Sequence, residues 1–228
     1  MFTPETLDFL STNRFMNSRE WYAEHKGEYK AHVLQPLVEM TEHLAPTLEE
    51  IDAQILTEPK VDVTISRIYR DMRRAKGDFY RDYMWLTFKR DKHRFPRYPE
   101  FFFVLSPTGF FWGCGHYAAA AETTACMHEM ILGNDPLFCK ADRALRRQHD
   151  YHLDGETYKR SRFPGATDTQ RDWLERKTIC LMHDGDPITD LFRADLAETI
   201  AESFRAMKPG YAFFLAATQK AHELRTDN

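Results

Sequence analysis

The sequence predicts a single α+β domain over residues 1–228, with a mainly antiparallel sheet flanked by N-terminal and C-terminal helices. Three observations lead to this prediction. Apolar residues recur at helical spacing near both ends of the chain, and two phenylalanine-rich runs surround a turn in its middle. No linker, repeat or low-complexity tract divides the 228 residues. Helices gathered at the ends, rather than alternating regularly with strands, favour α+β over α/β.

The first 50 residues are expected to be helical. Thr3 followed by Pro4 provides a cap and a proline in the first helical turn. Residues 17–20 resemble a capping box in which Asn17 is the cap. Pro36 is expected to kink or break this helical region, because proline lacks the N–H that a helix interior requires.

The middle of the chain changes to the period of a strand. Val61, Val63 and Ile65 alternate with polar residues, which predicts a half-buried strand. Residues 101–105 and 110–112 flank a turn at 106–109 that has proline second and glycine fourth. We therefore expect these two runs to pair as an antiparallel hairpin.

The last third of the chain is predicted to return to helices, with short strands between them. A helix over 118–132 should end at Gly133, and Asp135-Pro136 should open the next one. A short hairpin is expected across 151–158 and a last strand over 178–182. Two helices, 195–207 and 209–222, should finish the chain, separated at the proline between them.

Composition bounds the classes of function. Hydrophobic residues make up 43% of the chain and charged residues 29%, with a formal net charge of −4. A chain with this net negative charge is not attracted to nucleic acid by its overall charge, so nucleic acid is not the expected partner. No apolar run approaches the ~20 residues that cross a bilayer, and the N-terminal residues do not resemble a secretory signal. We expect a cytoplasmic protein that has no membrane partner.

The most unusual segment is the arginine-rich run at 66–80. If the predicted strand continues, Arg67 points to the face that buries Val61, Val63 and Ile65. A buried guanidinium must meet a carboxylate or line a wet cleft, and Asp71 is the nearest carboxylate in sequence. Two interpretations stay open: an ion pair that pins the strand end, or forked donors that face a phosphate or carboxylate ligand.

Four short motifs resemble one family. Arg67-x-x-Arg70-Asp71-x-Arg73 resembles the signature of the uncharacterised bacterial family DUF2461, domain of unknown function 2461. Residues 17–22 are similar to its N-terminal Asn-x-Arg-x-Trp-Phe, residues 113–117 to its Gly-x-Gly-x-Tyr, and residues 153–160 to its Gly…Lys-Arg strand. The resemblance implies a single-domain bacterial protein and brings no activity, cofactor or catalytic residue with it.

Gly113-Cys114-Gly115 also invites a phosphate-loop interpretation, but it has the spacing of neither common phosphate-binding motif. The glycines instead predict a close approach of backbones at a strand end.

The leading hypothesis is a protein that binds a small anionic ligand in a cleft near residues 67–73. Its candidate ligand-binding residues are Arg67, Arg70, Asp71, Arg73, Tyr80, Lys159 and Arg160. The arginines would hold the anion, Asp71 would orient an arginine or act as a general base, and Tyr80 would donate a hydrogen bond. Lys159 and Arg160 would close the cleft from a neighbouring strand. Catalysis is left open, because neither a nucleophile–base pair nor a metal set stands out.

Two other hypotheses stand beside it. The arginines could form a surface patch of a nucleic-acid-associated or protein-interaction module, or they could only brace the fold. A concave, partly buried cluster would favour the small ligand, and a flat exposed one would favour a macromolecule. The sequence does not specify the oligomeric state.

The four cysteines give the first prediction. They include no CxxC pair, and their spacing matches no usual ligand set. We expect the purified protein to carry no cofactor, no disulfide and no stoichiometric metal, because thiols of cytoplasmic proteins stay reduced. Elemental analysis that found about one zinc or iron per chain would contradict this prediction.

Overall fold

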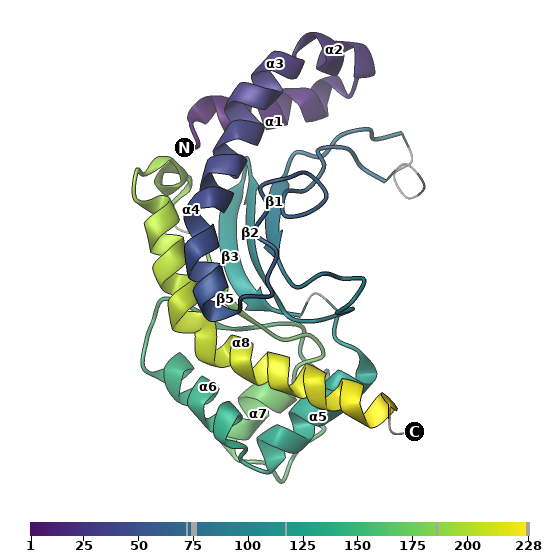
Figure 1. The fold of residues 1–228 in the computed structure, drawn as a ribbon, viewed down its shortest axis with the longest axis vertical. Helices are drawn as coiled ribbons and strands as arrows, with labels where there is room; N and C mark the ends of the chain where they lie inside the picture. Colours follow the sequence, from purple (N-terminus) through teal and green to yellow (C-terminus); the bar gives the residue numbers. More distant parts are fainter. Residues whose placement is uncertain (72, 74–76, 117, 186, 227–228) are drawn as a thin grey trace. The chain divides into compact units, whose positions relative to one another are not determined.

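The computed structural model describes residues 1–71, 73, 77–116, 118–185 and 187–226 (Figure 1). The predicted α+β class is confirmed, because helices combine with an antiparallel sheet whose five described strands lie in the order β1-β2-β3-β5-β4. No helix in the described part of the chain has the length and apolar character needed to cross a bilayer.

The helical elements of the described chain form two groups, one before residue 52 and one after residue 120. The first group comprises α1 (Pro4–Met16), α2 (Arg19–Glu24), α3 (Lys26–Glu28), the π-helix η1 (Tyr29–Leu34) and α4 (Gln35–Ile51). The others are α5 (Ala121–Leu132), α6 (Pro136–Arg146), α7 (Asp168–Leu174), the 3₁₀ helix η2 (Ile188–Phe192) and α8 (Leu196–Thr226). The strands are β1 (Met84–Phe88), β2 (Glu100–Ser106), β3 (Gly109–Gly115), β4 (His152–Asp154) and β5 (Cys180–His183).

Contacts within the chain gather into two compact units. The first unit comprises Met1–Phe88, Phe102–Trp112 and Asp184–Ala201. The second comprises Lys89–Phe101, Gly113–His183 and Glu202–Asn228. The assignment of 1–228 to a single domain stays a prediction, and each unit is described by itself below.

The helical chain is not broken at Pro36, where a kink or break is predicted, but its period changes there. The π-helix η1 ends directly before α4, and Pro36 lies in the first turn of α4. Proline cannot donate to the carbonyl four residues earlier, which belongs to His32. The hydroxyl of Thr6, a fully buried residue of α1, donates to that carbonyl at 2.6 Å. Thr6 therefore provides a hydrogen bond to the carbonyl of His32, close to the point where the π-helix η1 changes to the α-helix α4.

The predicted hairpin is present in the first unit. β2 and β3 are neighbours joined by Pro107 and Thr108, a link so short that the strands must run antiparallel. Ser106 stabilises the turn, since its hydroxyl donates to the carbonyl of Gly109 and accepts from the N–H of Thr108. Phe103, Leu105, Phe110 and Trp112 are buried, whereas the residues between them are half-buried. This period of two fixes which face of the sheet forms the core.

The strand predicted from Val61 to Ile65 is wrong. Residues 62–64 form a turn, and Asp62 adopts a left-handed conformation with φ 72°. Only isolated bridges involve this segment, and one of them pairs Ile65 with Leu86 of β1. The N–H of Ser66 donates to the carbonyl of Trp85 at 3.0 Å, so the segment covers the outer edge of β1. The apolar alternation reflects a tight turn whose Ile65 is buried, not an extended strand.

The hairpin expected across 151–158 is also wrong. β4 pairs antiparallel with β5, with Leu153 opposite Leu181, so the segment finds its partner far along the chain. Gly155 of this segment lies against the backbone of Thr178, where an added Cβ would come within 1.9 Å of the carbonyl oxygen. Glycine is required there for close approach.

The two predicted C-terminal helices form one helix. α8 continues through Pro209. In the second unit, the hydroxyl of Tyr151 donates to the carbonyl of Ala206 at 3.0 Å, in the turn before the proline. This bond lies one residue beyond the carbonyl of Arg205, which is the one that Pro209 cannot bind.

His116 gives a prediction for the pH dependence of stability. The side chain is buried in the second unit, and burial lowers its pKa to about 4 from the ordinary 6.5. Between these values the unfolded chain binds a proton that the folded chain does not. Stability should therefore fall as the pH drops from 6.5 to 4, by up to about 3 kcal/mol from this residue.

Denaturant titrations of the parent and of His116→Gln between pH 4 and 7 measure this contribution. The variant should show a shallower pH slope, whatever its absolute stability. His93→Gln, which changes an exposed histidine of the same unit, should keep the parental slope. Equal slopes for parent and His116→Gln would contradict the prediction.

Candidate functional site

The three motif arginines of the first unit bind three different carboxylates. Arg67 donates from Nε to Asp62 at 2.7 Å, and Arg73 makes two bonds of 3.0 Å to Asp71. The Arg67 and Arg73 side chains are 63% and 89% exposed. The expectation that Arg67 is buried and paired with Asp71 is therefore wrong. The strand on which its burial depended is a turn, and that turn presents Asp62 to Arg67.

Arg70 is the motif arginine with a long-range partner network. Its Nη1 donates to Oδ2 of Asp78 at 2.7 Å, and Nη2 of Arg14 donates to the same oxygen at 2.8 Å. The two arginine side chains are 34% and 31% exposed. The bond from Arg14 is the largest cause of a lowered pKa at Asp78, so this carboxyl is ionised at neutral pH. One carboxylate therefore faces two guanidinium groups, and the cluster Arg14–Asp78–Arg70 carries one net positive charge.

Asn17 holds the chain on both sides of Asp78. Its side-chain amide donates to the carbonyl of Gly77 at 2.8 Å, and its side-chain oxygen accepts from the N–H of Phe79 at 2.7 Å. Asn17 ends α1 in the left-handed conformation, with φ 45°. The expectation that Asn17 caps the next helix is wrong. The cap of α2 is Ser18, whose hydroxyl accepts from the N–H of Trp21. The N-terminal motif thus positions the carboxylate that Arg70 binds.

Aromatic rings support the same region. Tyr22 stacks on Tyr80 with ring centres 5.1 Å apart, and Tyr69 lies 5.2 Å from Tyr80. Burial raises the pKa of Tyr80, and the nearby guanidinium of Arg19 opposes that rise. Arg19 also lies over the ring of Phe79 at 4.8 Å. Tyr80 is buried, whereas Tyr69 is 46% exposed. The side chain of Tyr69 is also hydrogen-bonded to that of Tyr22.

Lys159 and Arg160 belong to the second unit, where both are exposed in a bend. The loop that follows is held by Glu175, whose carboxylate accepts from the hydroxyl of Ser161 and the N–H groups of Arg162 and Phe163. The role assigned to Lys159 and Arg160 in closing a cleft over residues 67–73 stays a prediction.

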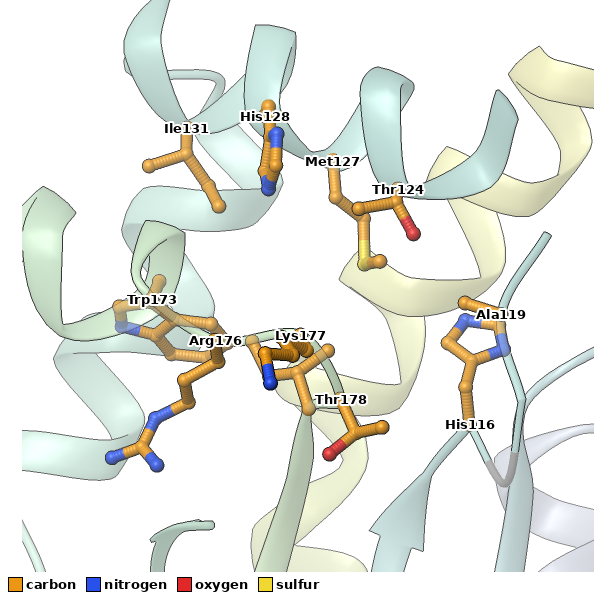
Figure 2. Close-up of a pocket in the computed structure, with 11 residues that line it drawn as sticks. His116, Ala119, Thr124, Met127, His128, Ile131, Trp173, Arg176, Lys177 and Thr178 are labelled. Atoms are coloured by element: carbon orange, nitrogen blue, oxygen red, sulfur yellow. The ribbon is translucent and has the colours of Figure 1, made fainter. Parts of the chain in front are cut away.

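A small cavity lies in the second unit. Its lining residues come from α5, from α7 and the segment leading to β5, and from the chain after β3 (Figure 2). His116 reaches it from the Gly113–Gly115 segment; Tyr117, the tyrosine matched to the family pattern, lies outside the described residues. Gly115 packs against Cys180, where an added Cβ would meet the Cys180 Cβ at 2.5 Å. The close approach of backbones predicted for this segment is therefore found at Gly115.

Among the described residues, no three or more His, Cys, Asp or Glu side chains are grouped so that they could hold a metal ion. All four cysteines are free thiols. Burial raises the pKa of Cys114, and it raises that of Cys180 to about 12, which disfavours a reactive thiolate at either position.

Comparison with known families identifies the family that the sequence resembles. The sequence model of the family DUF2461, described as conserved hypothetical proteins, matches residues 5–213. The chain therefore belongs to this family. The comparison with curated proteins finds no match.

Sequence reasoning missed Arg14 and Asp78 and gave Asn17 a different role. Arg14 and Asp78 are 64 positions apart, and no periodic pattern connects them. A signal did exist in the separate motifs around Asn17 and Arg70, which the fold brings together within the first unit.

Substitutions of Asn17 give a third prediction. Asn17→Gly keeps the left-handed backbone but loses both amide bonds, and it should lower the free energy of unfolding by about 1–3 kcal/mol. Asn17→Ala should lower it further, because alanine tolerates the left-handed region poorly. Urea titration measures both variants. If Asn17→Gly were as stable as the parent, the amide clamp would contribute nothing.

Proposed function

We propose that this protein binds a small phosphate- or carboxylate-bearing ligand at the Arg14–Asp78–Arg70 cluster of the first unit. The observation that carries the proposal is the single carboxylate oxygen shared by two guanidinium groups. A guanidinium has five N–H donors, so each arginine keeps donors beyond its bond to Asp78. Planar, forked donors suit phosphate and carboxylate oxygens.

Further groups beside the cluster would strengthen the attraction for an anion. Arg19 lies over the ring of Phe79, directly after Asp78, and adds a third guanidinium. Tyr69, one residue before Arg70, exposes its side chain and would donate its hydroxyl to the ligand. In this proposal Tyr80 supports Tyr69 from the core. Asp71 orients Arg73, to which it is already bonded, and not the ligand-binding arginines.

The exposed arginines favour a second candidate function. Arg67 and Arg73 project into solvent, as expected of a surface patch that meets a nucleic acid or a protein. Each is bonded to an aspartate only five or two residues away, which offsets its charge locally. The small-ligand function is preferred because two guanidinium groups share one bonded carboxylate in the Arg14–Asp78–Arg70 cluster, and Asp82 acts on Arg14 without a hydrogen bond to it.

A thermal-shift series tests the proposal. Inorganic phosphate or citrate should raise the melting temperature above that in chloride at equal ionic strength. Binding at 100 times Kd stabilises a protein by about 2.7 kcal/mol. Arg70→Gln should lose this response, and Arg70→Lys should weaken it, because a point charge cannot form the bidentate fork. Arg67→Gln is the matched control and should respond as the parent does.

Two outcomes would overturn the proposal. One is the absence of stabilisation by any phosphate- or carboxylate-bearing compound, and the other is an Arg70→Gln response equal to that of the parent. Salt-dependent binding of an oligonucleotide that is lost in Arg67→Gln and retained in Arg70→Gln would instead favour the surface patch.

A further inference from the structure

The link between β1 and β2, residues 89–99, is strongly basic and belongs to the second unit. Five of its residues are Lys or Arg, and Asp91 is its one acidic residue. The expectation against nucleic acid rested on the net charge of −4 of the whole chain, and this link has the opposite sign. Charges farther away than about 8 Å are largely screened at physiological salt. A partner that meets the link therefore responds mainly to the local positive charge.

A buried arginine holds the link from the inside. Arg90 is buried, and its guanidinium lies over the rings of Phe95 at 5.3 Å and Tyr98 at 5.5 Å. Tyr98 in turn packs against His222 of α8, with ring centres 5.3 Å apart. These contacts give the link a defined conformation, in which Arg90 and both rings face inward.

Asp91 fixes the turn that follows Arg90. Its backbone carbonyl accepts from the N–H groups of Arg94 and Phe95 at 3.1 and 2.7 Å, and its carboxylate accepts from the N–H of His93 at 3.0 Å. The carboxylate is thus engaged with the backbone of the turn, and no ion pair of Asp91 with a lysine or arginine is found among the described residues.

Three cations of the link point to solvent. Lys92, Arg94 and Arg97 are exposed, and no ion pair of any of them is found in the part of the chain that the structure describes. Lys89 differs, because its ammonium binds Glu100 at 2.9 Å. The three exposed cations lie within six consecutive residues, and they keep their charge and their N–H donors for a partner.

The side chains around these cations indicate the kind of partner. A membrane-binding segment or the centre of a protein interface needs exposed apolar side chains. The large apolar side chains that are exposed in the described chain include none from residues 89–99. Phe95 and Tyr98 are half-buried against Arg90, so they are not available to stack with bases. A phosphodiester backbone is the partner that requires only positive charge and hydrogen-bond donors.

We propose that Lys92, Arg94 and Arg97 bind the phosphate backbone of nucleic acid without reading its sequence. The link lies in a different unit from the Arg14–Asp78–Arg70 cluster, and this inference does not depend on the proposed function of that cluster.

Anisotropy of a labelled DNA duplex, titrated with the full chain, tests the inference. Three phosphate contacts give a slope of about −2.7 for the logarithm of affinity against the logarithm of salt concentration, so affinity should fall about 40-fold between about 50 and about 200 mM salt. Two duplexes of unrelated sequence should bind alike, because backbone contacts carry no sequence information.

Substitutions in the link should change this slope. Arg94→Gln and Arg97→Gln should each weaken binding and make the slope shallower by about 0.9, and either variant suffices if the other fails to fold. Arg143→Gln, which changes an exposed arginine of α6 in the same unit, is the matched control and should bind as the parent does. Arg67→Gln and Arg70→Gln should also bind the duplex as the parent does, which separates this surface from the sites in the first unit.

Three results would overturn the inference. The first is the absence of salt-dependent binding by the parent, and the second is an unchanged slope in both Arg94→Gln and Arg97→Gln. The third is binding of a polyglutamate peptide or of phosphatidylserine vesicles at least as tight as that of the duplex, since an acidic protein or a membrane would then be the better partner.

Discussion

The packing of alternate aromatic residues on one face of β2 and β3 is the constraint on which the first unit depends. Phe103 stacks on Phe2 at 5.7 Å and lies near Phe110, which in turn stacks on Trp112 at 6.1 Å. A one-residue slip would turn every one of these rings toward the other face, so the register is strongly specified. The register of the strands also fixes the position of the segments that bond to the edge of this sheet.

The segment that leads into the arginine motif is held at this edge. The N–H of Ser66 and the carbonyl of Thr64 both bond β1, which places residues 64–66 along its edge. The chain then leaves the edge at Arg67 and pairs with its own return, through the bridge between Tyr69 and Tyr80. Arg70 and Asp78 therefore come together because this short pairing follows a fixed edge. Asn17 completes the arrangement from the end of α1.

These relationships explain which features the sequence could predict. Residues 101–112 combine a period of two with a turn of defined chemistry, so local information was sufficient. The alternation at 61–65 had no such support, because a tight turn with one buried isoleucine produces the same pattern. The prediction that Arg67 is buried failed for the same reason. Alternate residues point to the same face only within a continuous strand. Gly155 was similarly ambiguous, because a turn and a close approach both require glycine.

The arginine–aspartate pairs also differ in how far apart the partners lie in the sequence. Arg67–Asp62 and Arg73–Asp71 join neighbours in sequence and are exposed, so they contribute little to stability. The bond between Arg14 and Asp78 spans 64 residues and could not be found from local spacing. A carboxylate can accept several hydrogen bonds, so Asp78 binds a second guanidinium. The repulsion between the two cations is partly offset at Arg14 by the nearby carboxylate of Asp82. Both guanidinium groups lower the pKa of Asp78, so each of them stabilises the ionised carboxylate that joins the end of α1 to the arginine motif. The N–H donors that remain on the two arginines are those that the proposed anion would use.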